Sequence, residues 1–277
     1  MSNFSHRRLL VVFSASFIFA AFLTVAHASH SWGGYHWART SNPFTLKVGD
    51  NVSSQWDAIL NTTISDWSKS TVCDLTKVAG QATGRCRGTS GRDEVCNGTY
   101  GNNGWLGVAS ISITGGTHIT LGTVKLNDTY FNTSKYNTTA WRNLVSCQEV
   151  GHTLGLDHQD TNFNNANLGT CMDYTNDPST NQHPNQHDYD ELVTIYSHLD
   201  SFTTISALLP GGPSTLALPT LPGDDMDEPW RWGTPVGWDG AGRGNVFVLD
   251  RGDGELLITR VIWTLNDEDA RENKKLQ

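Results

Sequence analysis

The chain has 277 residues, of which 37% are hydrophobic and 17% are charged, so it can form one substantial folded domain with an appendage. This composition excludes an intrinsically disordered chain. The formal net charge of -9 argues against a surface that binds phosphate groups, and we therefore expect no nucleic-acid partner.

The first 28 residues have the pattern of a secretory signal peptide. A basic stretch ends at Arg8, an apolar run covers residues 9–25, and Ala26 and Ala28 form an A-x-A cleavage site. The competing interpretation is an uncleaved membrane anchor, because the run is nearly long enough to span a bilayer. We favour cleavage after Ala28 and expect a secreted, extracellular protein with no stable membrane contact.

Five cysteines follow in the exported part, where thiols tend to pair. Pairing Cys86 with Cys96 would close a short Gly-rich loop, and pairing Cys147 with Cys171 would join two segments that carry the chemistry. Cys73 is then the odd one, although the sequence leaves the connectivity open. None of the five has C-x-x-C spacing, which disfavours a zinc knuckle.

The first half of the domain mixes strand and helix patterns. Residues 44–48 alternate like a short strand, and residues 52–67 have apolar positions at helical spacing. Residues 85–104 are rich in Gly, Asn, Thr and Arg, which predicts a loop. Residues 105–113 and 118–126 predict two strands joined across a Gly-Gly pair.

The second half of the domain is predicted to be helical. A helix that begins at Thr138 or Thr139 stops near Gly155. A second helix is predicted over residues 188–198, where apolar residues form one face. The domain, residues 29–200, ends soon afterwards.

The remaining residues look like a linker and a small tail. Residues 201–229 are rich in Pro, Gly, Leu and Asp, which is typical of a linker. In the tail, residues 230–277, the segments 245–249 and 255–263 predict one β-hairpin. A lone hairpin is too small to fold alone, so it either docks on the domain or stays loosely ordered. We assign this tail no function.

The predicted helix before Gly155 carries the chemistry. Positions four apart on a helix share a face, so Gln148 and His152 project together with Glu149 beside them. Gly155 lets the chain leave the helix in a backbone conformation that other residues resist, after which His158 can return toward the same point. Three donors and one carboxylate then surround one metal ion.

This segment resembles the metzincin signature H-E-x-x-H-x-x-G-x-x-H, and residues 171–174, Cys-Met-Asp-Tyr, resemble the Met-turn that follows it. The resemblance covers residues 37–199 in layout, and its specific part is 148–174. It implies an α+β, zincin-like fold with a twisted, mostly parallel sheet of about five strands and two long helices. A small C-terminal subdomain would hold Met172.

The resemblance also implies a role for each matching residue. Glu149 would be the general base, and His152 and His158 would bind zinc through imidazole nitrogen. Met172 would form the apolar floor beneath the metal. Tyr174 would ligate zinc or stabilise the tetrahedral intermediate. The implied reaction is peptide hydrolysis by zinc-activated water.

The implied partner is a protein or peptide substrate, bound by a monomer. In this family the strand nearest the cleft pairs with an extended substrate, and residues 105–113 are the candidate here. The mature chain would begin near residue 29 and enter its first strand by residue 44. We therefore expect no cysteine-bearing pro-segment and no latency through a thiolate on zinc.

Gln148 stands where the family pattern has its first histidine ligand. An amide oxygen can coordinate zinc, but it is a weaker donor than imidazole. We favour a zinc endopeptidase with Gln148, His152 and His158 as ligands, because the base and every other signature position remain. One alternative is an inactive, peptidase-shaped module that binds extended peptides or glycoproteins. Another borrows a ligand such as His118 or His187.

Two further ion sites are less favoured than this zinc site. His183 and His187 flank a polar loop before a helix, which is better explained by helix capping than by a second zinc. Asp157, Asp160, Asn162 and Asn164 supply oxygens at loop spacing that could suit calcium, but no EF-hand pattern is present.

Overall fold

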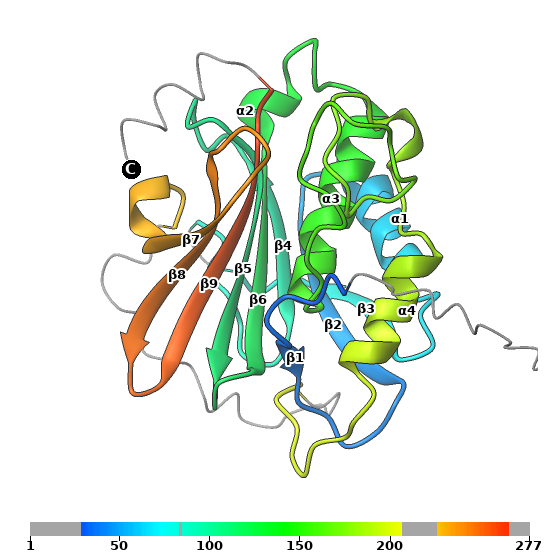
Figure 1. Cartoon of the computed structure of the whole chain (residues 1–277), viewed down its shortest axis with the longest axis vertical. Coiled ribbons are helices and arrows are strands. Elements are labelled where there is room, and N and C mark those ends of the chain that lie inside the picture. Colours follow the sequence, from blue (N-terminus) through cyan, green and yellow to red (C-terminus); the bar gives the residue numbers. More distant parts are fainter. Residues whose placement is uncertain (1–28, 83–84, 207–225, 266–277) are drawn as a thin grey trace, which may run out of the picture.

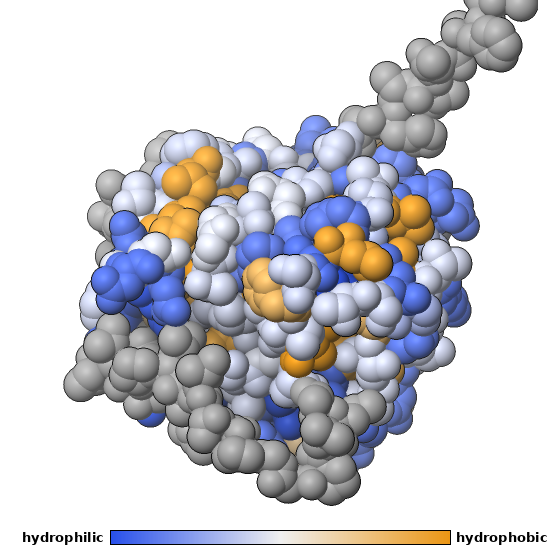
Figure 2. Space-filling view, turned by 90° about the horizontal axis from the view of Figure 1, so that it is seen from below, coloured by the Kyte–Doolittle hydropathy of each residue, from blue (hydrophilic) through white to orange (hydrophobic). Residues whose placement is uncertain are grey.

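The computed structural model describes residues 29–82, 85–206 and 226–265. The predicted signal peptide, most of the predicted linker and the last residues of the tail lie outside these ranges. In the part of the chain that is described, no helix is long and apolar enough to cross a membrane. The face seen from below carries small apolar patches separated by polar residues (Figure 2).

The described chain is a mixed α+β structure, as the sequence predicts. Helices alternate with strands at first, and strands alone close the chain. In order the elements are β1 (His36–Trp37), β2 (Phe44–Asn51), α1 (Asp57–Trp67), β3 (Cys73–Ala79), β4 (Asp93–Gly98), β5 (Trp105–Thr114), β6 (His118–Asn127), α2 (Asp128–Phe131), α3 (Thr139–Thr153), η1 (Pro178–Thr180), α4 (Gln186–Ile195), η2 (Pro229–Arg231), β7 (Thr234–Trp238), β8 (Gly244–Gly252) and β9 (Glu255–Trp263).

The described strands form one nine-stranded sheet, larger than the five strands expected. Its order is β3-β2-β4-β6-β5-β9-β8-β7, and β1 pairs with β6. The pairs among β1, β2, β3, β4 and β6 are parallel, whereas every pair from β5 onward is antiparallel. Helices α1, α3 and α4 lie on one side of the sheet, and the tail strands extend it beyond β5 (Figure 1).

The loop predicted over residues 85–104 is partly wrong, because β4 lies within it and occupies the sheet between β2 and β6. The strand was not predicted because it begins with two charged residues. Asp93 and Glu94 are fully buried, and Glu94 forms an ion pair with Arg92 at 2.9 Å. Charged residues are normally expected to be exposed, whereas these two are buried inside the sheet, where Glu94 has a cationic partner.

The predicted hairpin at residues 245–249 and 255–263 is confirmed as β8 and β9, and it docks on the domain. Strand β9 pairs with β5 along its length, from Trp105 opposite Trp263 to Ile113 opposite Leu256. A small apolar core stabilises this junction, because burial removes large aromatic surfaces from water. Its members are Trp105, Val108, Trp232, Phe247, Val261 and Trp263.

Two disulfides tie loops to the core, with the pairing expected from the sequence. Cys86 bonds to Cys96 in β4, and Cys147 in α3 bonds to Cys171. Cys73 is free and buried. The second disulfide fixes the segment that contains Met172 against helix α3, which carries Gln148 and His152.

Helix α3 begins and ends where the sequence predicts. The side chain of Thr138 accepts a hydrogen bond from the amide of Trp141 and caps the first turn. Gly155, just past the helix, has φ +97°. A Cβ there would collide with the carbonyl oxygen of Tyr35, so both the backbone angle and the space require glycine.

Substituting Gly155→Ala should therefore lower the free energy of unfolding by at least about 3 kcal/mol. The cost of a positive φ and the cost of the collision with the Tyr35 carbonyl group add to each other. The matched control is Gly169→Ala. Gly169 also has a positive φ, +73°, but a Cβ there meets nothing within 4 Å. The control should cost only about 1 kcal/mol. Equal losses in denaturant titrations would contradict this account of the helix end.

Candidate metal centre

Two histidines converge at the end of α3. The Nε2 atoms of His152 and His158 lie 2.9 Å apart, and both side chains are buried. The Nδ1 of His152 lies 2.8 Å from the carbonyl oxygen of Leu156 and donates to it, which places the lone pair of this imidazole on Nε2. The turn at Gly155 thus returns His158 to the helix face, as the spacing predicts.

Gln148 lies one turn before His152 and is fully buried. Its Nε2 donates to the carbonyl oxygen of Cys171 at 2.7 Å, and its Oε1 has no hydrogen-bond partner among the described residues. The disulfide of Cys171 to Cys147, the residue before Gln148, holds this carbonyl in place. The amide is therefore oriented with an unused oxygen, which is the atom that a metal would need.

Glu149 is also fully buried, and neither carboxylate oxygen has a hydrogen bond of ordinary geometry within the described ranges. Gly107 in β5 makes room for it, because a Cβ there would lie 2.9 Å from Oε1. Burial raises the pKa of Glu149 well above its usual value, while Arg260 and the backbone of Ala109 act in the opposite direction. Burial therefore favours the protonated form of this carboxyl group over the ionised form.

Met172 and Tyr174 flank the histidine pair. Met172 is buried, and its Sδ faces Gly151 of α3, where a Cβ would come within 2.6 Å. The Tyr174 ring packs edge-on against His158, with 4.4 Å between ring centroids. Its hydroxyl donates to the carbonyl oxygen of Val261 at 3.0 Å. The predicted site residues thus lie around one point, with the tyrosine hydroxyl bound to the tail.

The tail supplies a site residue that the sequence analysis missed. Arg260 of β9 lies opposite Ala109 of β5 and is 3% exposed. Its Nη1 is 2.6 Å from Asp157 Oδ1 and 3.1 Å from His158 Nδ1, and its guanidinium stacks on Trp32. A single cation inside the apolar strand 255–263 was the available signal, because an unpaired arginine is seldom buried.

Arg260 also sets the protonation pattern of the histidine pair. A guanidinium can only donate, so His158 accepts at Nδ1 and carries its proton at Nε2. That Nε2–H then donates to His152 Nε2, and His152 donates from Nδ1 to Leu156. In this tautomer His158 Nε2 has no lone pair to offer a metal.

The strand expected to bind an extended substrate is covered. The prediction of a strand over residues 105–113 is correct, since β5 is Trp105–Thr114. Its two neighbours in the sheet are β6 and β9, so the edge expected to be open is filled by the chain's own tail. The strand was predictable from the sequence but its partner was not, because the pairing joins segments about 150 residues apart.

The other histidines proposed as ligands make different contacts. His118 Nε2 lies 3.3 Å from Asp200 Oδ1, and the His187 ring stacks on His30. His183 Nδ1 pairs with Asp66 at 2.6 Å. Among the residues considered for calcium, Asp157 forms an ion pair with Arg260, and Asp160 Oδ1 accepts a hydrogen bond from the backbone amide of Asn162.

No family model matches the chain, and no curated protein does. Among solved structures it is similar to two of myroilysin, at 12% identity and TM-scores of 0.35 and 0.33, over 57% and 58% of this chain and 82% and 86% of those chains. It is also similar to high choriolytic enzyme 1, a hatching-enzyme zinc protease from the medaka fish Oryzias latipes, at 12% identity and a TM-score of 0.32, over 58% of this chain and 94% of that one. Likeness at these TM-scores carries no argument about function.

The last residue of α3 is held by a second buried carboxyl group. The Thr153 hydroxyl donates to Asp93 Oδ2, and burial raises the pKa of Asp93 to about 7. Between about pH 4 and pH 7 the folded chain therefore keeps a proton that the unfolded chain releases. Folding takes up a proton in this window, so Asp93 makes stability fall as pH rises through it.

The variant Asp93→Asn should remove this decline. Relative to wild type, its free energy of unfolding should rise between pH 4 and pH 7 by up to about 4 kcal/mol, at about 1.4 kcal/mol for each pH unit. Urea titrations of both proteins at several pH values measure the difference. A difference that does not change with pH would mean that Asp93 is ionised throughout.

Proposed function

We propose that this chain is a zinc-dependent endopeptidase, and that the described arrangement is its latent state. The observation that carries the proposal is that the Nε2 atoms of His152 and His158 converge to 2.9 Å at the end of α3, the helix that also carries Gln148 and Glu149. All four side chains are buried, and within the described chain Gln148 Oε1 has no hydrogen-bond partner and the Glu149 oxygens have no hydrogen bond of ordinary geometry. Buried polar atoms without partners are rare, and a metal ion with a water molecule would satisfy them.

The donor set suits zinc. Two imidazole nitrogens and one neutral oxygen leave a fourth position open, which is the pattern of catalytic rather than structural zinc sites. When bound, zinc would supply Lewis-acid polarisation of a water molecule and of the peptide carbonyl group. Gln148 is a weak donor, but Cys171 already holds its amide in one orientation, so little ordering remains to oppose binding.

The chain's own residues would then perform the proton transfers. Glu149, when ionised, would accept a proton from water, and its raised pKa favours the protonated form that then returns this proton to the leaving amine. The Tyr174 hydroxyl, once it leaves Val261, can donate to the oxygen of the peptide carbonyl group. Strand β5 would offer its backbone to an extended peptide once β9 leaves.

Strand β9 opposes both substrate binding and zinc binding at the site. It pairs with β5 where the substrate would lie, and it places a positive charge 3.1 Å from His158. A cation at this distance disfavours a second cation strongly in a buried site. Substrate binding and zinc binding therefore both require the tail to move.

A second function competes, and the hydrogen-bond chain from Arg260 through His158 and His152 to Leu156 favours it. These hydrogen bonds give every ring nitrogen of both imidazoles a partner without a metal ion. The protein would then be a peptidase-shaped module that binds extended peptides or glycoproteins. Zinc binding and turnover separate the two functions.

The variant Arg260→Met should raise zinc affinity by about tenfold or more, because it removes a buried charge next to His158. Competition with a chromogenic chelator measures the affinity. Arg243→Met is the matched control, since Arg243 is another buried tail arginine, paired with Asp239 at 2.8 Å. Equal affinities in wild type and both variants would place zinc away from the histidine pair.

The variant Thr259→Pro should activate the enzyme. Thr259 is fully buried in β9 opposite Ser110 of β5, and proline there removes a ladder hydrogen bond. With zinc present, hydrolysis of a fluorogenic denatured protein should rise about tenfold or more. The control Thr234→Pro lies on β7, at the edge of the sheet, and should change little.

Adding Glu149→Gln to Thr259→Pro should reduce the gained hydrolysis by about 100-fold or more, because the base is lost while the shape is kept. A Thr259→Pro protein that binds zinc but cleaves nothing would reject the enzyme and support the binding module.

A further inference from the structure

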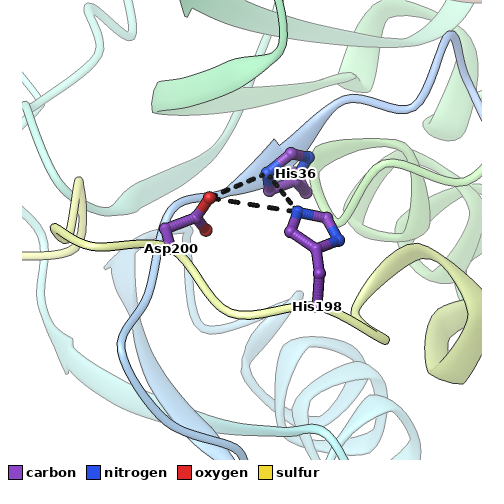
Figure 3. Close-up of side chains that lie close together, drawn as sticks. All are labelled: His36, His198 and Asp200. Carbon is purple, nitrogen blue, oxygen red and sulfur yellow. Dashed lines mark hydrogen bonds and ion pairs between the residues drawn. The ribbon is translucent and has the colours of Figure 1, made fainter.

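Two remote parts of the chain meet at a second cluster of side chains, separate from the pair of His152 and His158. His36 comes from β1, and His198 and Asp200 come from the segment after α4 (Figure 3). The Nε2 atoms of His36 and His198 are 3.1 Å apart, and they lie 3.7 Å and 3.9 Å from Asp200 Oδ1. Within the described chain this is the one set of three such ligand atoms that lie within 4.8 Å of one another.

We propose that His36, His198 and Asp200 bind a structural divalent transition-metal ion, with zinc as the favoured ion. In tetrahedral zinc sites with bond lengths near 2 Å, neighbouring ligand atoms are about 3.3 Å apart. The three distances here, 3.1 to 3.9 Å, bracket that value, so small side-chain shifts would complete the geometry. Two imidazoles and one carboxylate are a common zinc donor set.

The surrounding contacts orient two of the three ligands, His36 and Asp200. The Nδ1 of His36 donates to the carbonyl oxygen of Gly34 at 2.8 Å, so its Nε2 lone pair faces the cluster. Asp200 Oδ2 accepts from the amide and the Nη1 of Arg39, at 3.1 and 3.2 Å, which turns Oδ1 toward the histidines. Outer contacts of this kind typically fix the ligands of metal sites.

His118 approaches the same carboxylate from the neighbouring strand. It lies opposite His36 in the β1–β6 pair, and its Nε2 is 3.3 Å from Asp200 Oδ1. Since its nitrogens are not among the three that converge, we assign His118 the task of holding the carboxylate. The fourth position of the ion is left to water.

The position of the cluster explains what the ion would do. The side chains of His36 and Asp200 are 6% and 9% exposed, whereas that of His198 is 52% exposed, so an ion can enter from solvent beside His198. Backbone bonds from Asp200 to Arg39 and from Thr204 to Ala38 already join the two segments. The ion would stabilise this junction between the segment of β1 and the segment after α4.

The junction also supports the end of α3. Trp37, next to His36, donates from Nε1 to the carbonyl oxygen of Thr153 at 2.9 Å. Tyr196, two residues before His198, donates its hydroxyl to Leu154 at 3.0 Å. An ion at the cluster would therefore stabilise the base of the helix that carries Gln148 and His152. The proposal does not depend on peptidase activity, because it concerns different ligands.

The test uses the full chain and the variant His198→Ala. Titration with Co²⁺, followed by its visible absorption, and zinc counting after dialysis give the number and affinity of bound ions. The matched control is His183→Ala, because the side chain of His183 is 53% exposed and pairs with Asp66 outside the cluster. Wild type and both variants keep His152 and His158, so any ion bound by that pair is counted equally in all three proteins.

We expect His198→Ala to bind one ion fewer than wild type, or to bind it at least about 100-fold more weakly, while His183→Ala binds as wild type does. Added zinc should raise the Tm of wild type and of His183→Ala more than that of His198→Ala. Because His198 is half exposed, its loss should leave the fold intact, and far-UV circular dichroism checks this. Equal ion counts, affinities and zinc-induced Tm shifts in all three proteins would overturn the proposal.

Discussion

The pairing of β9 with β5 is the interaction on which the arrangement of the candidate metal centre depends. It places Arg260 against Asp157 and His158, and it engages the Tyr174 hydroxyl through Val261. It also buries the Trp105 and Trp263 side chains almost completely. A buried cation is tolerated there because Asp157 compensates its charge at 2.6 Å. One strand thus pairs with the edge of β5 that the proposal assigns to the substrate, fixes a histidine tautomer and completes a core.

Helix α3 is held in position from both ends and from beneath. The Cys147–Cys171 disulfide fixes the carbonyl oxygen that orients Gln148, and Met172 packs where Gly151 leaves room. At the other end, Trp37 and Tyr196 bind the last carbonyl groups of the helix. A site held so firmly can use a weak ligand such as glutamine, because its donor atoms need little rearrangement. The proposed second ion would add to the same support.

Local features of the site were predictable from the sequence, and long-range ones were not. The cap at Thr138, the stop at Gly155 and the return of His158 depend on spacing within about 20 residues, so they follow from helix geometry. The hairpin at β8 and β9 follows from its turn and its apolar residues. Its docking on β5 depends on register between distant segments, and so does the approach of Arg260 to His158. The cluster of His36 and Asp200 joins residues 164 positions apart and leaves no local pattern.

The measurement that tests the central claim most directly is anomalous X-ray diffraction at the zinc absorption edge, from crystals of the Arg260→Met chain grown with zinc. The account predicts a peak between the Nε2 atoms of His152 and His158, with Gln148 Oε1 turned toward it. No peak at that position, at a zinc concentration that fills other sites in the crystal, would contradict it. The pair of His152 and His158 would then hold no metal, and the chain would be a binding module with a peptidase-like helix.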